Sequence, residues 1–344
     1  MAEISQLGPN RLGWIDRTKG IGIILVVLGH LSATWAKFVF VFHMPLFFVL
    51  SGFLFNANRR PSEYWTAKLH HLAVPYLGFL MLFNLKPCAA LLLQMSHGLA
   101  TVNWHFFKNH FINQIWGGVK LTEGQVIFWF PPVLLFTQLV YYHLNRLFSK
   151  LALKILICIS YLLALANQWF YPGIQLPLAT NVVLGALPFF YFGASLRQNQ
   201  GSVNLTRFLC LIFLATLVAT IFSDLQLEIN MRTADYGLPV ISLLSALGGS
   251  IICFRLAEKI REDSLLSKSL MAVGGGSMTI MYGHEYFMNL FASMHLSYLI
   301  LTPLIIGLCW GIHWLLTLNH FTSAVFIGAS ISGDKPSKNG LRQS

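Results

Sequence analysis

The sequence predicts an all-α polytopic membrane protein with about ten transmembrane helices and both termini in the cytoplasm. Of its 344 residues, 56% are hydrophobic and 10% are charged, and the mean hydropathy is +0.64. Soluble domains carry about 25% charged residues, so the composition excludes an ordinary soluble domain. Two further observations support the prediction, namely apolar windows that recur along the chain and basic residues that alternate between the connections.

Windows of roughly 17 to 25 apolar residues suit the thickness of the hydrocarbon core of a bilayer. They lie at about 20–36, 38–56, 72–95, 126–143, 151–168, 176–196, 205–223, 237–256, 270–292 and 296–317. The first is not a signal peptide, because it lacks a small-residue cleavage site and a second span follows at once. We expect residues 1–318 to form one ten-helix membrane domain, and residues 319–344 to form a disordered cytoplasmic tail.

Lysine and arginine residues are distributed unevenly between the two sets of connections. One set holds 18 of the 23 basic residues, whereas the opposite set holds Lys37, Lys108, Lys120 and Arg232. The positive-inside rule therefore places the richer set, and both termini, in the cytoplasm. In a soluble protein the net charge of +11 would suggest nucleic-acid binding. Because the charge here follows the spans, it indicates topology, and no nucleic-acid partner is expected.

The first two windows, over residues 16–55, carry polar residues inside apolar runs. Lys19 and His30 are eleven positions apart, which on a helix is three turns and about 20° of drift, so both lie on one face. His30 would lie roughly 16 Å deeper than Lys19. A tight connection around Lys37 makes the runs antiparallel and returns His43 to the depth of His30. An ionisable residue inside a membrane is by default a candidate functional residue.

The ninth window contains a third polar cluster, with His284 and Glu285 inside an apolar helix. The lipid-facing side of such a helix should be apolar, so we expect both to face the bundle or a water-filled cavity. A single intramembrane histidine can instead be a hydrogen-bonded packing residue. The connection between the seventh and eighth windows holds Asp224, Glu228 and Asp235, and we expect it to be a solvated loop.

The cytoplasmic segment NRRPSEYWTAKLHHLAVPYL, which enters the third span, concentrates positive charge beside the inner end of the first hairpin. Two interpretations remain open, since such charges commonly only set topology. The alternative is a site for an anionic cytosolic ligand, such as the phosphates of a nucleotide or of coenzyme A. On a helix, Lys68 and His71 would share one face. The basic side chains of this cytoplasmic patch are Arg59, Arg60, Lys68, His70 and His71.

The non-cytoplasmic segment TVNWHFFKNHFINQIWGGVK mixes aromatic residues with amides. Its composition is typical of an interfacial helix, and a sugar-binding role is the alternative. The five cysteines lie in apolar runs without paired spacing, so they indicate neither a disulfide framework nor a metal site.

A membrane histidine near a cation suits general-base activation of a hydroxyl group. The same residues could form the proton relay of a transporter. No nucleophile elbow of the GxSxG type and no HExxH motif is present. The residues themselves leave this choice open.

The runs IDRTKGIGIILVVLGH, FHMPLFFVLSGFLF, YWTAKLHHLAVPYL, FWFPPVLLFTQL and SMTIMYGHEYF resemble, in order and spacing, the membrane acyltransferase-3 family. Within that family the chain resembles the fucose 4-O-acetylase-like branch of polysaccharide O-acetyltransferases. The resemblance implies transfer of an acyl group, commonly acetyl from cytosolic acetyl-CoA, to a sugar hydroxyl of a surface polysaccharide or its lipid-linked precursor. It implies a multi-pass protein of the bacterial inner membrane, with acetyl-CoA as donor substrate and no tightly bound cofactor.

In the family, ten residues separate a characteristic arginine from the essential histidine that follows it. Matched by position, the arginine falls on Lys19 and the histidine falls on His30. Lysine keeps the charge but lacks the bidentate fork of arginine. The family's basic pair at the start of the third helix falls on Lys68 and His71. His43 and Ser51–Gly52 match the second-helix motif, and His284 matches a histidine of the penultimate helix.

These matches define the expected site. His30 would deprotonate the acceptor hydroxyl or relay the acyl group, with help from His43, while Lys19, Arg59, Arg60, Lys68 and His71 would hold the donor. Ser51, Gln138, His284 and Glu285 would contact the acceptor. The alternative from another class is a transporter or flippase that uses the histidines as a proton relay. Its expected signatures, two repeated halves and paired broken helices, are not visible in the sequence.

Overall fold

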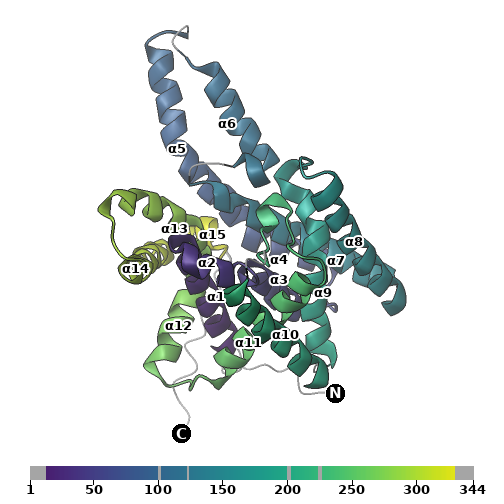
Figure 1. The fold of residues 1–344 in the computed structure, drawn as a ribbon. Helices are drawn as coiled ribbons and strands as arrows, with labels where there is room; N and C mark the ends of the chain where they lie inside the picture. The colour runs from purple at the N-terminus through teal and green to yellow at the C-terminus, as the bar shows by residue number, and fades with distance from the viewer. Residues whose placement is uncertain (1–12, 100–101, 122–123, 200–202, 224–226, 330–344) are drawn as a thin grey trace, which may run out of the picture.

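A computed structural model describes residues 13–99, 102–121, 124–199, 203–223 and 227–329. This part of the chain is built from α-helices and short 3₁₀ or π turns, and no strand forms in it (Figure 1). The all-α prediction is confirmed. The helices are α1 (Gly13–Leu31), α2 (Ala33–Val39), α3 (His43–Phe53), α4 (Pro61–Lys68), α5 (Val74–Ser96), α6 (Trp104–Trp116), α7 (Phe130–Leu147), α8 (Lys150–Phe170), α9 (Val183–Asn199), α10 (Val203–Phe222), α11 (Ile241–Lys259), α12 (Leu265–Gly275), α13 (Ser277–Phe291), α14 (Tyr298–Thr317) and α15 (His320–Ile327).

Eight helical segments in the described residues are long and apolar enough to cross a membrane. They correspond to predicted spans other than the first and the ninth, which contain His30 and His284. In α1 the first turns carry Asp16, Arg17 and Lys19, and the ninth span is divided. The eight segments are Ala33–Phe53, Pro61–Ser96, Val126–Leu147, Lys150–Phe170, Pro177–Gln198, Val203–Phe222, Ile241–Lys259 and Tyr298–Thr317.

Two predicted spans are broken helices, which corrects the expectation of continuous ones. The window 270–292 is divided into α12 and α13 at Gly276. The window 38–56 is divided at residues 40–42, which form a turn between α2 and α3. Irregular backbone at membrane depth is tolerated where it lines a cavity or is covered by protein. Here the freed carbonyl of Phe40 accepts a hydrogen bond from the backbone N–H of Ile229 (3.0 Å).

Local sequence explains where several helices begin. The side chains of Asn103, Ser149 and Ser264 each accept a hydrogen bond from a backbone N–H in the first turn of α6, α8 and α12. Such caps satisfy N–H groups that have no partner within the helix. Helix α7 carries Pro131 and Pro132 in its first turn, where the missing N–H of proline removes no helical hydrogen bond.

Glycines bring two helix pairs into backbone contact. Gly52 of α3 lies against the carbonyl of Phe190 in α9, and Gly193 of α9 lies against the carbonyl of Val49. A Cβ atom at either glycine would collide with the backbone of the other helix. The pair α1 and α12 is packed in the same way by Gly20 and Gly274. Since lipid is as apolar as a leucine side chain, close packing of small residues is a main source of helix association in membranes.

Arg17 ties α1 to its neighbours. Its side chain is 2% exposed and donates hydrogen bonds to the carbonyl of Ala257 in α11 (2.8 Å) and to the hydroxyl of Ser267 in α12 (3.0 Å). A buried guanidinium must be hydrogen-bonded to be tolerated. Arg17 therefore holds the first half of α1 in place, in addition to the topogenic role predicted for its charge.

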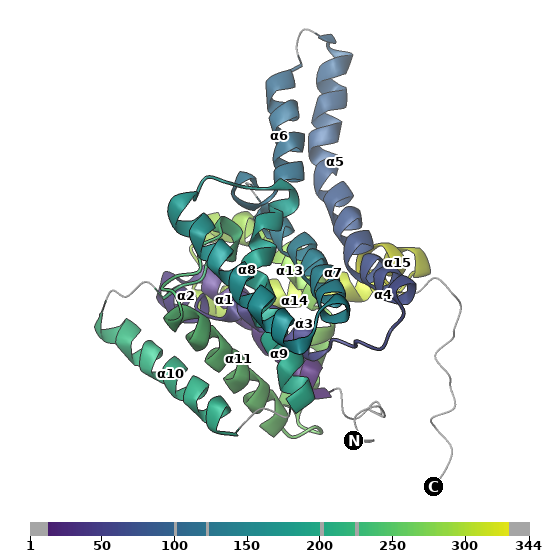
Figure 2. The same cartoon turned by 90° about the vertical axis from the view of Figure 1, so that its right-hand side faces the viewer.

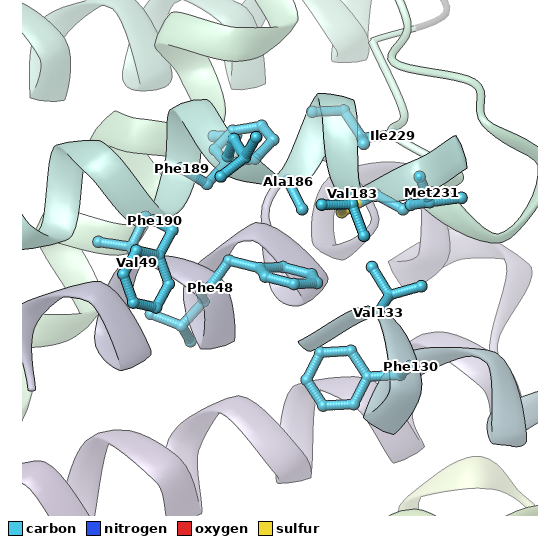
Figure 3. Packing of buried hydrophobic residues seen from close by; sticks show 14 of the residues in the cluster. Phe48, Val49, Phe130, Val133, Val183, Ala186, Phe189, Phe190, Ile229 and Met231 are labelled. Atoms are coloured by element: carbon cyan, nitrogen blue, oxygen red, sulfur yellow. The ribbon is translucent and has the colours of Figure 1, made fainter. Parts of the chain in front are cut away.

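The buried core joins α3, α7 and α9 to the connection between α10 and α11 (Figure 3). The rings of Phe48 and Phe130 pack edge to face with centroids 5.4 Å apart. Ile229 and Met231 of the connection are each 1% exposed and lie beside Val183 of α9. The prediction of a solvated loop holds for Glu228 and Asp235, which are exposed, but alternate apolar side chains anchor the connection in the core. Asp224 lies outside the described residues.

Helices α5 and α6 form a hairpin that projects from the bundle in both views (Figures 1 and 2). The continuous helical segment Pro61–Ser96 has 36 residues, or about 54 Å at 1.5 Å per residue. This exceeds a hydrocarbon core of about 30 Å, so the segment extends beyond the membrane at one end.

The predicted disordered tail begins with an ordered helix, α15. Val325 and Phe326 of α15 pack against Gly78 and Phe79 of α5, and His70 Nδ1 lies 3.0 Å from the carbonyl of Gly328. The apolar side chains of residues 324–327 find partners on α5, which explains the difference from the expectation for this part. Residues 330–344 lie outside the described residues.

Candidate active-site cavity

A cavity of about 640 Å³ lies inside the helix bundle, a volume within the range of about 300–1,000 Å³ that is usual for small-molecule sites. It is lined by residues of α1, α3, α7, α13 and α14, together with the connection between α10 and α11. Six residues singled out from the sequence line it: Lys19, His30, His43, Ser51, His284 and Glu285. Gln138, Arg59, Arg60, Lys68 and His71 are not among the lining residues.

Three histidines from three helices meet in this cavity. The ring of His30 lies 5.4 Å from that of His284 and 6.5 Å from that of His43, measured between centroids. Phe40, in the turn between α2 and α3, stacks on His43 at 4.6 Å and lies 5.2 Å from His30. His30 and His43, which were predicted to lie at one depth, are thus joined by His284. The ring of Phe40 contacts those of His30 and His43.

The three imidazoles differ in access to the cavity. His30 is exposed, whereas His43 and His284 are 5% and 1% exposed. A group that takes a proton from a bound hydroxyl must come within hydrogen-bond reach of it. Of the three, His30 is therefore the one placed to contact a substrate, and the other two form the wall behind it.

The hydrogen bonds of His284 define its neutral tautomer. Its Nδ1 lies 2.8 Å from the carbonyl of Met281 and 3.1 Å from that of Ile280. Carbonyl oxygens only accept, so Nδ1 carries the hydrogen and donates. Nε2 is then left with its lone pair. The turn of α13 that precedes His284 thereby fixes the orientation of the ring.

Lys19 lines the cavity about three turns before His30 on α1. Its Nζ forms an ion pair with Asp16 at 2.9 Å, and its side chain is 34% exposed. Arg17, the other basic residue of this turn, is buried against α11 and α12 and does not line the cavity. Lys19 is therefore the cation that α1 presents to the cavity.

Arg232 is a second cation of the cavity, and sequence reasoning missed it. It follows the buried residues Ile229 and Met231, whose packing brings the connection over the cavity. Arg232 lines the same cavity as His30 and Glu285. Its Nη1 also lies 3.5 Å from the carbonyl of Leu121. The signal in the sequence was alternation, since apolar residues occupy positions 227, 229 and 231.

Glu285 lines the cavity beside Arg232 and Asn289. Within the described residues its buried Oε2 has no hydrogen-bond partner. A buried carboxylate oxygen without a partner costs free energy, so this atom is available to a ligand that donates a hydrogen bond. Both His284 and Glu285 face the cavity, as their position in an apolar helix predicted.

Ser51 and Gln138 form one unit, but only Ser51 lines the cavity. The Gln138 side-chain amide donates to the Ser51 hydroxyl at 2.8 Å, and its backbone carbonyl accepts from the hydroxyl of Tyr64 at 3.4 Å. Gln138 is 3% exposed. Gln138 therefore does not face the cavity, in contrast to the expectation that it contacts the acceptor directly. Instead it positions the hydroxyl group of Ser51.

The cytoplasmic patch lies beside the cavity without lining it. Lys68 extends over the ring of Tyr64 at 5.4 Å, and Arg59, Arg60 and His71 are exposed. Leu72, the residue after His71, lines the cavity. Residues Leu69–Ala73 form a π-helical turn, a feature frequent at functional sites. The patch thus sits at the edge of the cavity, while its donor-binding role stays a prediction.

His313 of α14 also lines the cavity and was not singled out from the sequence. Its Nδ1 lies 3.1 Å from the hydroxyl of Thr279, another lining residue. His313 is a single histidine in an apolar run, so no spacing to another polar residue marked it in the sequence. No group of three histidine, cysteine, aspartate or glutamate residues in the described ranges has an arrangement that could hold a metal ion.

The helices and the cavity together define an integral membrane protein whose bundle holds three histidines and two cations around one cavity. Comparison with protein families identifies an acyltransferase domain of the acyltransferase-3 type over residues 12–318. The chain belongs to this family and is a membrane acyltransferase, as the motifs indicated. No curated protein and no solved structure matches the chain.

Proposed function

We propose that this protein is an O-acetyltransferase that moves an acetyl group from cytosolic acetyl-CoA to a sugar hydroxyl. The acceptor is a surface polysaccharide or its lipid-linked precursor, as in the fucose 4-O-acetylase-like branch, and the site lies in a bacterial inner membrane. One observation carries the proposal: the accessible His30 lies in a single cavity with Lys19 of the same helix and with Arg232 of the connection between α10 and α11. A base and two cations suit acyl transfer through a negatively charged intermediate.

The chemistry begins at His30. Its imidazole takes the proton of the acceptor hydroxyl as the hydroxyl oxygen attacks the thioester carbonyl carbon. The carbon–sulfur bond then breaks, and the coenzyme A sulfur leaves with the proton returned from His30. Atoms and charge balance without a further reactant, and the rings of His43 and His284 lie beside the imidazole of His30.

The donor would occupy the end of the cavity nearest Lys19. Lys19 and His30 are separated by eleven residues of α1, a rise of about 16 Å, so one cation cannot hold the phosphates and also contact the reacting carbonyl. Lys19 and the cytoplasmic patch of Arg59, Arg60, Lys68 and His71 would bind the polar part of the donor. The acyl end would then reach toward His30.

Arg232 would stabilise charge at the reacting end. It lines the cavity together with His30, and a guanidinium is suited to hold the oxyanion formed on the carbonyl oxygen. Ser51, Glu285 and Asn289 offer hydrogen-bond partners to the acceptor sugar. A transporter with a histidine proton relay is the weaker alternative, because the family of the chain transfers acyl groups.

Mass spectrometry of the surface polysaccharide tests the proposal directly. Cells in which the gene is deleted should lose one class of O-acetyl group, and the gene supplied on a plasmid should restore it. Unchanged acetylation of every surface glycan in the deletion strain would contradict the proposed acceptor.

Lys19→Arg should retain most of the transfer activity, whereas Lys19→Met should weaken donor binding by about tenfold. A charge-assisted hydrogen bond contributes roughly 1.5–3 kcal/mol, and arginine keeps the charge that methionine lacks. The apparent KM for acetyl-CoA in proteoliposomes measures the effect. Equal KM values for wild type and Lys19→Met would mean that this lysine only sets topology.

Neutralising Lys68 and His71 together, as Lys68→Met with His71→Leu, should raise the apparent KM for acetyl-CoA by about a hundredfold or more, since each change removes a donor of hydrogen bonds to phosphate. Arg59 and Arg60 remain and keep this connection on the cytoplasmic side. Cysteine accessibility on the connection controls for sidedness. An unchanged donor KM in a correctly inserted protein would move the donor site elsewhere.

A further inference from the structure

A second cavity, of about 340 Å³, lies between α6 and the segment that leads to α7. Its wall is formed largely by side chains with both donors and acceptors, spaced along one face of α6. His105, Asn109 and Asn113 follow one another at intervals of four residues, which places them on one side of a helix. Gln125 and the ring of Phe106 complete the wall. We call this space the polar cavity.

A buried network of amides holds the polar cavity in shape. The Gln114 side chain donates to Asn84 of α5 at 2.8 Å and to Gln125 at 3.0 Å, and His110 Nε2 lies 3.0 Å from the Asn84 oxygen. Asn84, Gln114 and Gln125 are each less than 10% exposed. Fully paired buried networks give rigidity, so the α5–α6 hairpin and the segment before α7 form a fixed wall.

The polar cavity is adjacent to the active-site cavity. Gln125 lines the polar cavity, and the next residue, Val126, lines the active-site cavity. Leu121 lines the polar cavity, and its carbonyl faces Arg232 Nη1 of the active-site cavity. The two spaces therefore lie side by side near Arg232.

The chemistry of the polar cavity suits a neutral sugar. Amides and imidazoles each offer donors and acceptors, as vicinal hydroxyl groups require, and Lys120 is the charged residue among those that line the cavity. Phe106 is 52% exposed and its ring lies nearly parallel to that of His110, so it presents a flat apolar surface. A few placed polar groups beside an aromatic face are typical of small-molecule recognition.

We propose that the polar cavity is a glycan subsite. It binds a sugar unit of an oligosaccharide or polysaccharide acceptor, one or more units away from the sugar whose hydroxyl group enters the active-site cavity beside His30. This inference rests on the proposed function, and it adds that the acceptor is recognised as a chain rather than as a single sugar.

Binding of length-graded fragments tests the subsite separately from catalysis. The fragments are prepared by partial hydrolysis of the surface polysaccharide from cells that lack the gene, and binding is measured on full-length His30→Ala protein in detergent. We expect a tetrasaccharide to bind at least tenfold more tightly than the monosaccharide. Adding Asn109→Leu and Asn113→Leu should remove about tenfold of that affinity, equivalent to 1.4 kcal/mol, and leave monosaccharide binding unchanged.

Matched variants distinguish a subsite from a folding effect. Lys108→Leu changes an exposed residue of α6 that does not line the polar cavity and should leave binding of every fragment unchanged. Phe106→Leu keeps an apolar side chain but removes the flat ring, and should weaken tetrasaccharide binding. Equal affinity of all lengths in the parent protein, or an equal loss at all lengths in the double variant, would overturn the subsite. Chain-length-dependent binding without acetyl transfer by the wild type would instead overturn the proposed function.

Discussion

His30→Ala is expected to lower acetyl transfer by about 10²- to 10⁴-fold, the usual contribution of a general base. The physical reason is access: His30 is exposed to the cavity while His43 and His284 are buried. Neither of the two can take over the proton without a movement of α3 or α13. The measurement is the rate of acetyl transfer from labelled acetyl-CoA in proteoliposomes that contain equal amounts of protein.

Membrane insertion should survive this change, since removal of an imidazole makes α1 more apolar. His320→Ala is the matched control, because His320 is an exposed residue of α15 that does not line the cavity. It should transfer acetyl groups at the wild-type rate. Normal transfer by well-expressed His30→Ala protein would exclude His30 as the base, and an equal loss in both variants would indicate a general effect of histidine removal.

Arg232→Met is expected to lower kcat by about 10²- to 10³-fold, the loss seen when one oxyanion-stabilising group is removed. Arg232→Lys should keep part of the rate, because lysine keeps the positive charge but not the planar fork. The loss should appear in kcat more than in the KM for acetyl-CoA, since the guanidinium would act on the intermediate. Lys19→Met should show the opposite pattern, with a larger effect on the KM for acetyl-CoA than on kcat.

Lys108→Met is the control for Arg232→Met. Both residues are among the few basic residues predicted on the non-cytoplasmic side, so both changes alter the charge bias in the same direction. Lys108 does not line the active-site cavity. A kcat for Arg232→Met equal to that of Lys108→Met would contradict the assignment of Arg232 to the reacting end.

The broken helix over residues 38–56 explains how Arg232 comes to line the cavity that holds His30. A continuous helix over residues 38–56 would use the carbonyl of Phe40 in its own hydrogen-bond ladder. The turn at residues 40–42 frees this carbonyl for the N–H of Ile229, and buried Ile229 and Met231 then hold the connection against α9. The same turn places Phe40 between the rings of His30 and His43. One interruption of helix thus organises both the histidines and the cation.

The sequence by itself determined the properties that follow from helix periodicity and from the free energy of placing each residue in lipid. Apolar length predicts spans, charge predicts sidedness, and the eleven-residue spacing of Lys19 and His30 predicts a shared face. The cavity-lining positions of His43, Ser51, His284 and Glu285 follow from the same rule, since polar side chains in a membrane avoid lipid. Motifs in that pattern also identified the acyltransferase-3 family, which the domain match confirms.

Only the tertiary structure decided the residues that reach the site from elsewhere in the chain. Arg232 enters on a connection, His313 faces the cavity through the packing of α14, and Gln138 stands behind Ser51. The tertiary structure also decided between Arg17 and Lys19, which are two positions apart. Arg17 is buried between helices, whereas Lys19 lines the cavity. The reason is physical: hydrogen bonds within a helix depend on nearby residues, whereas the contacts between helices depend on close packing of residues far apart in sequence.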